Sequence, residues 1–440
     1  MISATKRWYP DATRLWLPVI VMLLAVLIAP GVLAAKTKID YWNVGGAKKE
    51  YIEHMVEAFN RTSTDIVVEP TRLAGSSSDL SQIVAAHVSG NVPDLIYTDR
   101  GAVRNLRATG ILMDLTPYIE KEKWDLQREW VSATLGTVTL KGRFYGIPVD
   151  ALVMTALFRN KAMFADVGLD PEWAPTTIAE LEEADRRLTR MGSDGRATQV
   201  GFVPWGGVGQ NAFMWSLLWG SDWWDPIKKQ PILNGPRNLE LFQWGESWAR
   251  RSSDVIGSGW GSASSFVNRY VAMAMMGGEQ LPSLRSAGMD TDMIGVTPMP
   301  RAPGDSESRW YVAGEAFAIP TLAKNPEAAW QVAKWMLEPK NAAEFAVISG
   351  KPPARLVSAR TFMATLTDPI YKDLMQISFI AEPVGVAGTP LDSEAGNALF
   401  RDAWDRVVKL QESAVVALDR VQALSEAKVR EYLTQAGPWW

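Results

Sequence analysis

The fold is decided by residues 85–118, which read AAHVSGNVPDLIYTDRGAVRNLRATGILMDLTPY. A helical pattern that starts before this block continues into it and ends at Gly90, a residue type that favours helix C-termini. Pro93 and Asp94 then precede a short apolar strand at 95–97, and a further helix is predicted from about 102 to 109. The block therefore predicts helix, strand and helix in alternation.

The residues before this block repeat the alternation. Residues 38–42 and 65–69 predict two strands, and the segment between them carries apolar residues at helical spacing, namely Ile52, Met55, Val56 and Phe59. Alternating strands and helices indicate an α/β fold with a parallel sheet, whose ligands bind at the carboxyl ends of the strands. Polar or glycine-rich loops leave those ends at 42–48, 73–78 and 98–100, so we expect binding there.

The second half of the chain contains clear helix signals. Thr177 and Glu180 form the pattern of a capping box ahead of an apolar run. Asn325 and Pro326 predict an N-cap and a first-turn proline, and residues 401–432 carry one long helical pattern. The three methionines of residues 273–276 are interpreted as core residues.

Eight of the twenty tryptophans lie between Trp205 and Trp260, in a stretch rich in glycine. Four of them fall at the i, i+4 spacing of one helix face and are predicted to be core: Trp215, Trp219, Trp244 and Trp248. The other four lie in predicted loops: Trp205, Trp223, Trp224 and Trp260. Indole rings in such loops favour a partly apolar cleft, and their flat faces suit sugar rings.

Residues 1–35 have the pattern of a secretory signal peptide. Lys6, Arg7 and Arg14 form a positive segment ahead of an apolar run, and Ala34 or Ala35 fits the cleavage rule. The apolar run is shorter than a membrane-spanning helix requires. The chain contains no cysteine, so we expect no disulfide and no acylated N-terminus, and a periplasmic location.

The composition limits the function. Apolar residues make up 47% of the chain, charged residues 21%, and the net charge is −4, which suits compact acidic lobes and not nucleic-acid binding. The two histidines fall on different predicted helices, and no metalloprotease, nucleotide-binding or serine-hydrolase motif is recognisable. We therefore expect no catalytic residues, no metal and no cofactor. A pair of loop carboxylates is left open as an alternative, among Asp99, Asp150, Asp222, Asp225, Glu279 and Glu315.

Taken in order, these segments resemble the extracellular solute-binding proteins of ABC importers, in the maltose-binding-protein-like branch. The resemblance rests on the block at 85–118 and on segments in family order, including GRFYGIPVDA at 142–151, FRNKAMFADVGLDP at 158–171 and NPEAAWQVAKWML at 325–337. It implies a two-lobed α/β fold, each lobe a mostly parallel sheet flanked by helices, with a hinged ligand cleft. The implied division is a signal peptide at 1–35, one lobe at 36–149 and 313–355, and the other at 150–312 and 356–440.

The resemblance also implies ligand contacts, one position at a time. In the first lobe and at the hinges these are Trp42, Asn43, Asp99, Arg100, Asp150, Glu315 and Arg355. In the second lobe they are Trp205, Trp223, Trp224, Trp260 and Glu279. The chain departs from the family at two places: Arg159 stands where an aromatic residue is frequent, and Glu279 where many sugar binders have tryptophan.

The expected function is that of a monomeric periplasmic receptor, without enzymatic activity, that delivers a carbohydrate to the permease subunits of an ABC importer in the inner membrane. Two alternatives stay open. The same scaffold could bind a polyol, a glycerol-phosphate derivative or an amino compound, which Arg100, Arg159 and Arg355 make worth considering. The loop carboxylates could instead belong to a secreted glycan-cleaving enzyme.

Overall fold

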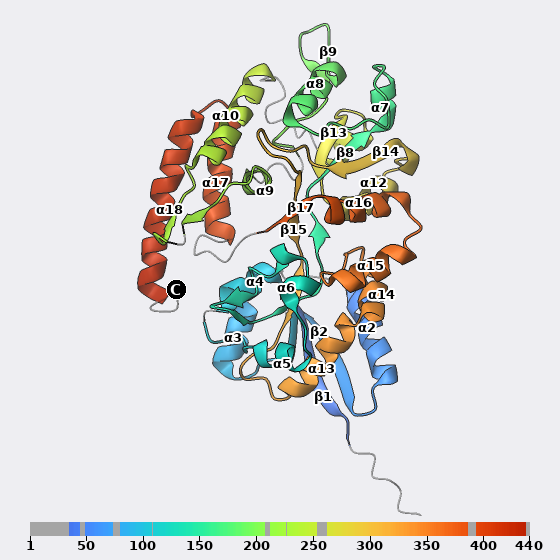
Figure 1. Cartoon of the computed structure of the whole chain (residues 1–440), viewed down its shortest axis with the longest axis vertical. Helices are drawn as coiled ribbons and strands as arrows, with labels where there is room; N and C mark the ends of the chain where they lie inside the picture. The colour runs from blue at the N-terminus through green and yellow to red at the C-terminus, as the bar shows by residue number, and fades with distance from the viewer. Residues whose placement is uncertain are drawn as a thin grey trace, which may run out of the picture.

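The chain forms two lobes joined by strands that cross between them (Figure 1). The computed structural model describes residues 35–44, 49–73, 80–107, 109–206, 212–225, 227–252, 262–385 and 393–436. Of the predicted signal peptide, all but residue 35 lies outside these ranges, and so does Trp260. None of the described helices is long and apolar enough to cross a membrane.

The first lobe is built on a five-stranded sheet of order β2-β1-β3-β16-β6. Strands β1, β2 and β3 are parallel, whereas β16 runs antiparallel to both β3 and β6. The strands are β1 (Thr37–Val44), β2 (Ile66–Leu73), β3 (Leu95–Asp99), β6 (Ile147–Pro148) and β16 (Glu315–Ala318). Its larger helices are α2 (Lys49–Thr62), α3 (Ser81–Ser89), α4 (Arg100–Leu106), α13 (Pro326–Leu337) and α14 (Pro339–Ser349).

The sequence pattern explains these elements directly. The apolar face of α2 is buried at all four predicted positions, Ile52, Met55, Val56 and Phe59. Helix α3 ends at Gly90, which has a φ of 73° in the left-handed region. Helix α13 differs in one detail, because the Asn325 side chain makes no capping hydrogen bond. Its Nδ2 instead donates to the Lys38 carbonyl of β1 at 3.3 Å.

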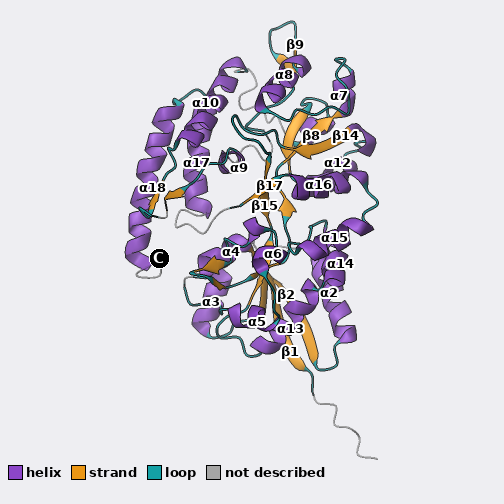
Figure 2. Ribbon diagram, viewed as in Figure 1, coloured by secondary structure: helices purple, strands orange, loops and turns teal. Residues whose placement is uncertain are grey.

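Smaller elements complete the first lobe and its edge. These are α5 (Thr116–Lys121), α6 (Leu126–Glu129), η2 (Ser132–Thr134), β4 (Thr139–Leu140) and β5 (Arg143–Phe144). Helix α15 (Leu356–Thr365) begins at the expected lobe boundary and packs against α14 through Ala359 and Phe362. Figure 2 shows helices on both sides of this lobe's sheet.

The sheet of the second lobe is antiparallel, which corrects the expectation of a mostly parallel sheet in each lobe. Strand β8 (Ala156–Asn160) lies between β13 (Met273–Met276) and β14 (Ile294–Pro298) and runs opposite to both. The outer strands run the same way because α12 (Leu281–Ser286) returns the chain between them. The methionines of β13 are fully buried, as predicted.

The helices of the second lobe enclose an aromatic core. Trp215 and Trp219 both pack against Trp244, with ring centroids 5.2 Å and 5.0 Å from it, and Trp244 packs in turn against Trp248. None of the four is more than 9% exposed. The prediction that these four tryptophans are core is confirmed. The helices are α8 (Ile178–Leu188), α9 (Ala212–Leu218), α10 (Pro236–Arg251), α17 (Ser393–Val408) and α18 (Ala414–Ala436).

Two helix predictions can be compared in detail. The capping box is confirmed, since Thr177 accepts from the Glu180 backbone and the Glu180 carboxylate accepts from the Thr177 backbone. The single helical pattern at 401–432 is divided between α17 and α18, because Leu410 takes a φ of 56° in the turn between them. The remaining elements of this lobe are α7 (Lys161–Ala165), β9 (Arg190–Met191), β10 (Ala197–Gln199), β11 (Trp224–Asp225), β12 (Gln230–Pro231), α11 (Ala263–Val267), η5 (Gly278–Gln280), η6 (Thr291–Met293) and α16 (Pro369–Ile380).

A small sheet lies where the chain crosses between the lobes. Strand β15 (Arg309–Ala313) pairs with β7 (Leu152–Val153) on one side and β17 (Glu382–Val384) on the other. Gly314 connects β15 to β16 with a φ of 140°, a conformation that side chains disfavour. A Cβ atom there would stand 2.2 Å from the Asp150 Oδ1 atom. The crossing therefore requires glycine for both its backbone conformation and its space.

We expect Gly314→Ala to lower the melting temperature more than Gly304→Ala does. Gly304 also has a positive φ, but a Cβ atom there has no neighbour within 4 Å, so that variant carries only the backbone cost of roughly 1 kcal/mol. Gly314→Ala adds the clash with Asp150, which for overpacked sites costs about 1–3 kcal/mol more. Thermal unfolding of both variants measures the difference. Equal decreases in melting temperature would contradict the close contact between position 314 and Asp150.

The Asp185 carboxylate ties α8 to the segment that carries Trp205. Its Oδ1 accepts hydrogen bonds from the Phe202 backbone at 2.8 Å and from the Thr189 hydroxyl at 3.1 Å. Burial raises the pKa of Asp185 to about 6, against about 3.9 in an unfolded chain. The folded state therefore holds this proton more tightly than the unfolded state. Protonated Asp185 therefore favours the folded state. This contribution to the free energy of unfolding is fully present below about pH 3.9 and is lost as the pH rises through about 6.

Asp185→Asn should therefore stabilise the fold relative to wild type more at pH 7.5 than at pH 4.5. Asparagine keeps the Oδ1 acceptor and carries no buried charge at either pH. Thermal unfolding at the two pH values measures this difference, with the exposed Asp194→Asn as control. If the melting temperatures of Asp185→Asn and wild type differed by the same amount at both pH values, this would contradict the prediction that the buried Asp185 charge destabilises the fold at pH 7.5.

Candidate interlobe ligand site

A pocket of about 150 Å³ lies between the two lobes, at the carboxyl end of β3. The first lobe contributes the start of α4 and the segment around η2. The second lobe contributes Phe213 of α9, and the end of β15 forms the base. The lining residues are Asp99, Arg100, Gly101, Arg104, Ala133, Thr137, Phe213, Tyr311, Val312, Ala313 and Gly314. Two predicted ligand contacts, Asp99 and Arg100, thus line one pocket.

Asp99 and Arg100 are held by backbone contacts. The Asp99 Oδ1 atom accepts from the Gly101 backbone at 2.7 Å and so caps α4. The Arg100 backbone donates to the Gly314 carbonyl at 3.1 Å, and its Nη2 donates to the Val312 carbonyl at 3.0 Å. The crossing strand therefore positions this arginine at the junction of the lobes.

The electrostatics of these two side chains are set by burial. Burial raises the pKa of the Asp99 carboxyl, although the hydrogen bond from Gly101 and the charges of Arg100 and Arg104 oppose the rise. Burial likewise lowers the pKa of Arg100, and the carboxylates of Asp150 and Asp99 oppose that fall. The Arg100 Nε and Nη1 atoms are buried without a hydrogen-bond partner among the described residues.

Aromatic rings form the opposite wall of the pocket. The rings of Phe213 and Tyr311 pack edge to face with centroids 5.2 Å apart. Trp223 packs on Phe213 at 5.7 Å and on Phe400 at 4.9 Å, and its Nε1 donates to the Ser216 hydroxyl at 2.6 Å. Trp223 thus supports the wall from behind. Phe213 and Tyr311 were not predicted, because Phe213 lies on a helix and Tyr311 on a crossing strand.

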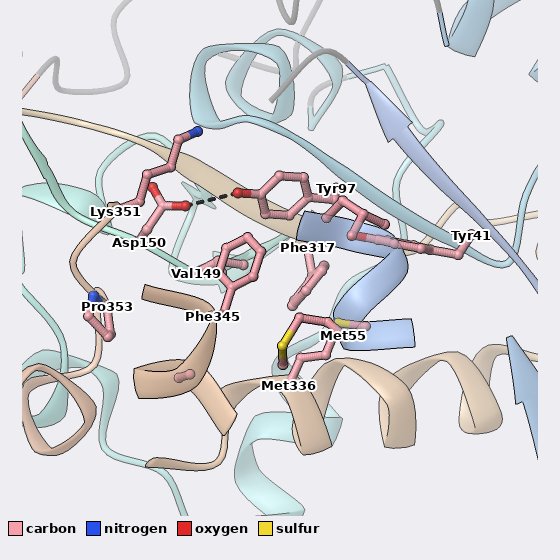
Figure 3. A pocket seen from close by; sticks show the side chains of 12 residues that line it. Tyr41, Met55, Tyr97, Val149, Asp150, Phe317, Met336, Phe345, Lys351 and Pro353 are labelled. Carbon is pink, nitrogen blue, oxygen red and sulfur yellow. Dashed lines mark hydrogen bonds between the residues drawn. The ribbon is translucent and has the colours of Figure 1, made fainter. Parts of the chain in front are cut away.

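Asp150 and Glu315 belong to a buried network beneath the pocket. Tyr97 donates to the Asp150 Oδ2 atom at 3.0 Å, the contact drawn as a dashed line in Figure 3. The Glu315 backbone donates to Asp150 Oδ1 at 3.0 Å, and Lys351 donates to the Glu315 carboxylate at 2.6 Å. Asp150 and Glu315 are 1% and 7% exposed. Both acids therefore stabilise the segment where the chain crosses between the lobes.

Burial and the charges within this network shift the pKa values of its members. Burial raises the pKa of Glu315 well above its ordinary value, and the neighbouring Asp150 raises it further. Burial works against the charge on Lys351, but Asp150 and Glu315 together raise its pKa. Beside the network, Figure 3 shows a small cavity inside the first lobe, lined by apolar side chains such as Phe317 and Phe345. At about 20 Å³ it has room for roughly one water molecule.

Four other predicted ligand contacts lie near strand ends or between the hydrophobic cores of the two lobes. Trp42 and Asn43 lie at the end of β1, with Asn43 opposite Tyr97 of β3. Asn43 is buried and Trp42 is half-buried against the first lobe's core. Trp205 is half-buried between the two cores, and Trp224 pairs with Pro231 in the β11–β12 hairpin. Their role in binding stays a prediction.

The other charged residues that the sequence suggested lie away from this pocket. The Arg355 guanidinium bonds to Glu129 at 2.6 Å and lies over the rings of Trp124 and Trp130. Arg159 donates to the carbonyls of Pro171 and Glu172 within the second lobe. Glu279 is exposed at η5. Of the three arginines considered for an anionic ligand, Arg100 is the one that lines the interlobe pocket.

Comparison with known proteins gives relatives and a structural match. A maltooligosaccharide ABC transporter solute-binding lipoprotein of Streptococcus pneumoniae is 25% identical over 292 residues, 64% of this chain and 63% of the relative. An sn-glycerol-3-phosphate-binding periplasmic protein of Shigella dysenteriae is 22% identical over 72% of this chain and 74% of its own length. The sugar-binding protein MalE of Xanthomonas citri superposes with a TM-score of 0.75 at 16% identity, covering 91% and 99% of the two chains.

These matches agree with the architecture. The chain spans 63% of the length of the maltooligosaccharide-binding relative, and the MalE superposition shows a shared two-lobed fold. Residues 45–343 match the family described as bacterial extracellular solute-binding protein, which is more than half of the chain. The protein therefore belongs to the bacterial extracellular solute-binding protein family.

Proposed function

We propose that this protein encloses a carbohydrate between its two lobes and delivers it to the permease subunits of an ABC importer. The observation that carries the proposal is the interlobe pocket, which combines buried polar groups of one lobe with an aromatic wall of the other. The names of the maltooligosaccharide-binding relative and of MalE support a sugar as ligand. Family membership supports its role as a solute receptor.

The pocket offers the chemistry that sugar recognition needs. Asp99 can accept hydrogen bonds from hydroxyl groups, and the free N–H groups of Arg100 can donate to ring or hydroxyl oxygens. Phe213, supported by Trp223, presents an apolar surface for the carbon face of a sugar ring. Because these groups come from different lobes, rotation about the crossing strands would open and close the site.

Several further features belong to the same proposal. The receptor is monomeric, periplasmic and not lipidated, since the chain has no cysteine to acylate. It has no enzymatic activity, because Asp150 and Glu315 are engaged by Tyr97, Lys351 and backbone groups. The lobes divide at 149/150, 312/313 and 355/356. A polyol, amino compound or glycerol-phosphate derivative is the alternative ligand, the last supported by the name of the Shigella relative.

Binding should raise the melting temperature, because a ligand that binds only the native state stabilises it by mass action. At a ligand concentration one hundred times the Kd, the gain is about 2.7 kcal/mol. Thermal-shift measurements with mannobiose, maltotriose, glucose and glycerol test the proposal. The absence of any shift with these and with their acidic or phosphorylated counterparts would contradict it.

Phe213→Ala should remove most of the ligand-induced shift while the protein without ligand stays folded. The matched control is Trp173→Ala, because Trp173 is a half-buried aromatic residue of the second lobe that packs on Phe164, away from the pocket. Circular dichroism verifies folding of both variants. Full retention of the shift in Phe213→Ala would place the ligand elsewhere.

A further inference from the structure

The first turns of α4 place two cations in the wall of the interlobe pocket. Arg100 and Arg104 are four positions apart and lie on one face of this helix. Both line the pocket, and their exposed fractions are only 4% and 3%. Asp99 is the one carboxylate among the lining residues. The wall therefore carries more positive than negative charge.

Arg100 is a buried cation, and the nearby carboxylates of Asp99 and Asp150 form their hydrogen bonds with other groups. It forms no ion pair with any described residue, and its Nε and Nη1 atoms have no hydrogen-bond partner there. The Asp99 carboxylate is turned toward the Gly101 backbone, and the Asp150 carboxylate is held by Tyr97 and Glu315. A ligand that accepted hydrogen bonds from these two atoms would satisfy them and place a further negative charge beside the buried guanidinium.

The two free nitrogens favour a particular chemical group. The guanidinium is planar and positively charged, so its N–H groups suit the charged oxygens of a carboxylate or a phosphate. Nε and Nη1 lie on different edges of the group, and each can form half of a paired contact together with the second hydrogen of Nη2. A neutral hydroxyl could accept one hydrogen bond but would add no negative charge beside the guanidinium. The pocket volume of about 150 Å³ is smaller than the roughly 300 Å³ at which whole-ligand sites begin, so it suits one group of a larger ligand.

We infer that this pocket is an anion subsite, in which Arg100 and Arg104 bind a carboxylate or phosphate group of the transported solute. The inference rests on the proposed function, because it takes the interlobe pocket as the ligand site. It assigns the cargo to acidic or phosphorylated carbohydrates and polyols. Asp99 and Tyr311 are then placed to contact hydroxyl groups beside the anionic group.

Matched pairs of solutes test the inference by calorimetry. Glucose is compared with glucuronate and glucose 6-phosphate, and glycerol with sn-glycerol 3-phosphate. We expect an anionic member to bind at least tenfold more tightly than its neutral partner. Its affinity should fall as the salt concentration rises, because the contact is between charges. The carboxylate and phosphate arms distinguish the two possible groups.

Arg104→Gln should weaken binding of the anionic solute at least tenfold and reduce its salt dependence. Arg420→Gln is the control, because it removes one positive charge from α18, where Arg420 pairs with Asp402 and Glu412. If Arg104→Gln does not fold, the salt dependence of the wild type still decides. A neutral sugar that binds as tightly as its anionic partner would overturn the inference and leave the proposed function standing. Failure of every solute to bind would count against both.

Discussion

The close contact between Gly314 and Asp150 is the constraint on which the junction of the lobes depends. The Asp150 carboxylate occupies the space where any other side chain at position 314 would begin. From there it links Tyr97 of β3 to the backbone of Glu315, and Glu315 links to Lys351. Four separate segments of the chain thus meet in one buried polar network. Such networks are stable only when each member is satisfied, so each of these contacts helps to hold the crossing segments together.

The same crossing determines the chemistry of the pocket above it. The Gly314 carbonyl accepts from the Arg100 backbone, and the Val312 carbonyl accepts from its side chain. These contacts keep a guanidinium at the junction of the lobes while Asp150, the nearby acid, is occupied below. The interlobe pocket therefore combines a cation from one lobe with the Phe213 ring from the other. A ligand that contacts both would hold the lobes together.

Local periodicity predicted much of the fold, but it could not predict relationships between distant segments. The buried face of α2 and the four core tryptophans follow from helical spacing. Strand direction in the second lobe depends on how α12 returns the chain, which no local pattern reveals. Asp99 and Arg100 were predicted from their place after a strand. Phe213 and Tyr311 were missed, because only tertiary packing brings residues almost a hundred positions apart into contact.

The central claim is that a ligand in the interlobe pocket draws the lobes together, and a distance measurement tests it most directly. The chain has no cysteine, so Val88→Cys in α3 and Ile227→Cys beside β11 give one label on each lobe. Both positions are well exposed, at 81% and 91%. Pulsed electron paramagnetic resonance measures the distance between spin labels at these two positions. With a saturating concentration of a solute that raises the melting temperature, the distance distribution should become shorter and narrower. An unchanged distribution at saturation would contradict the account.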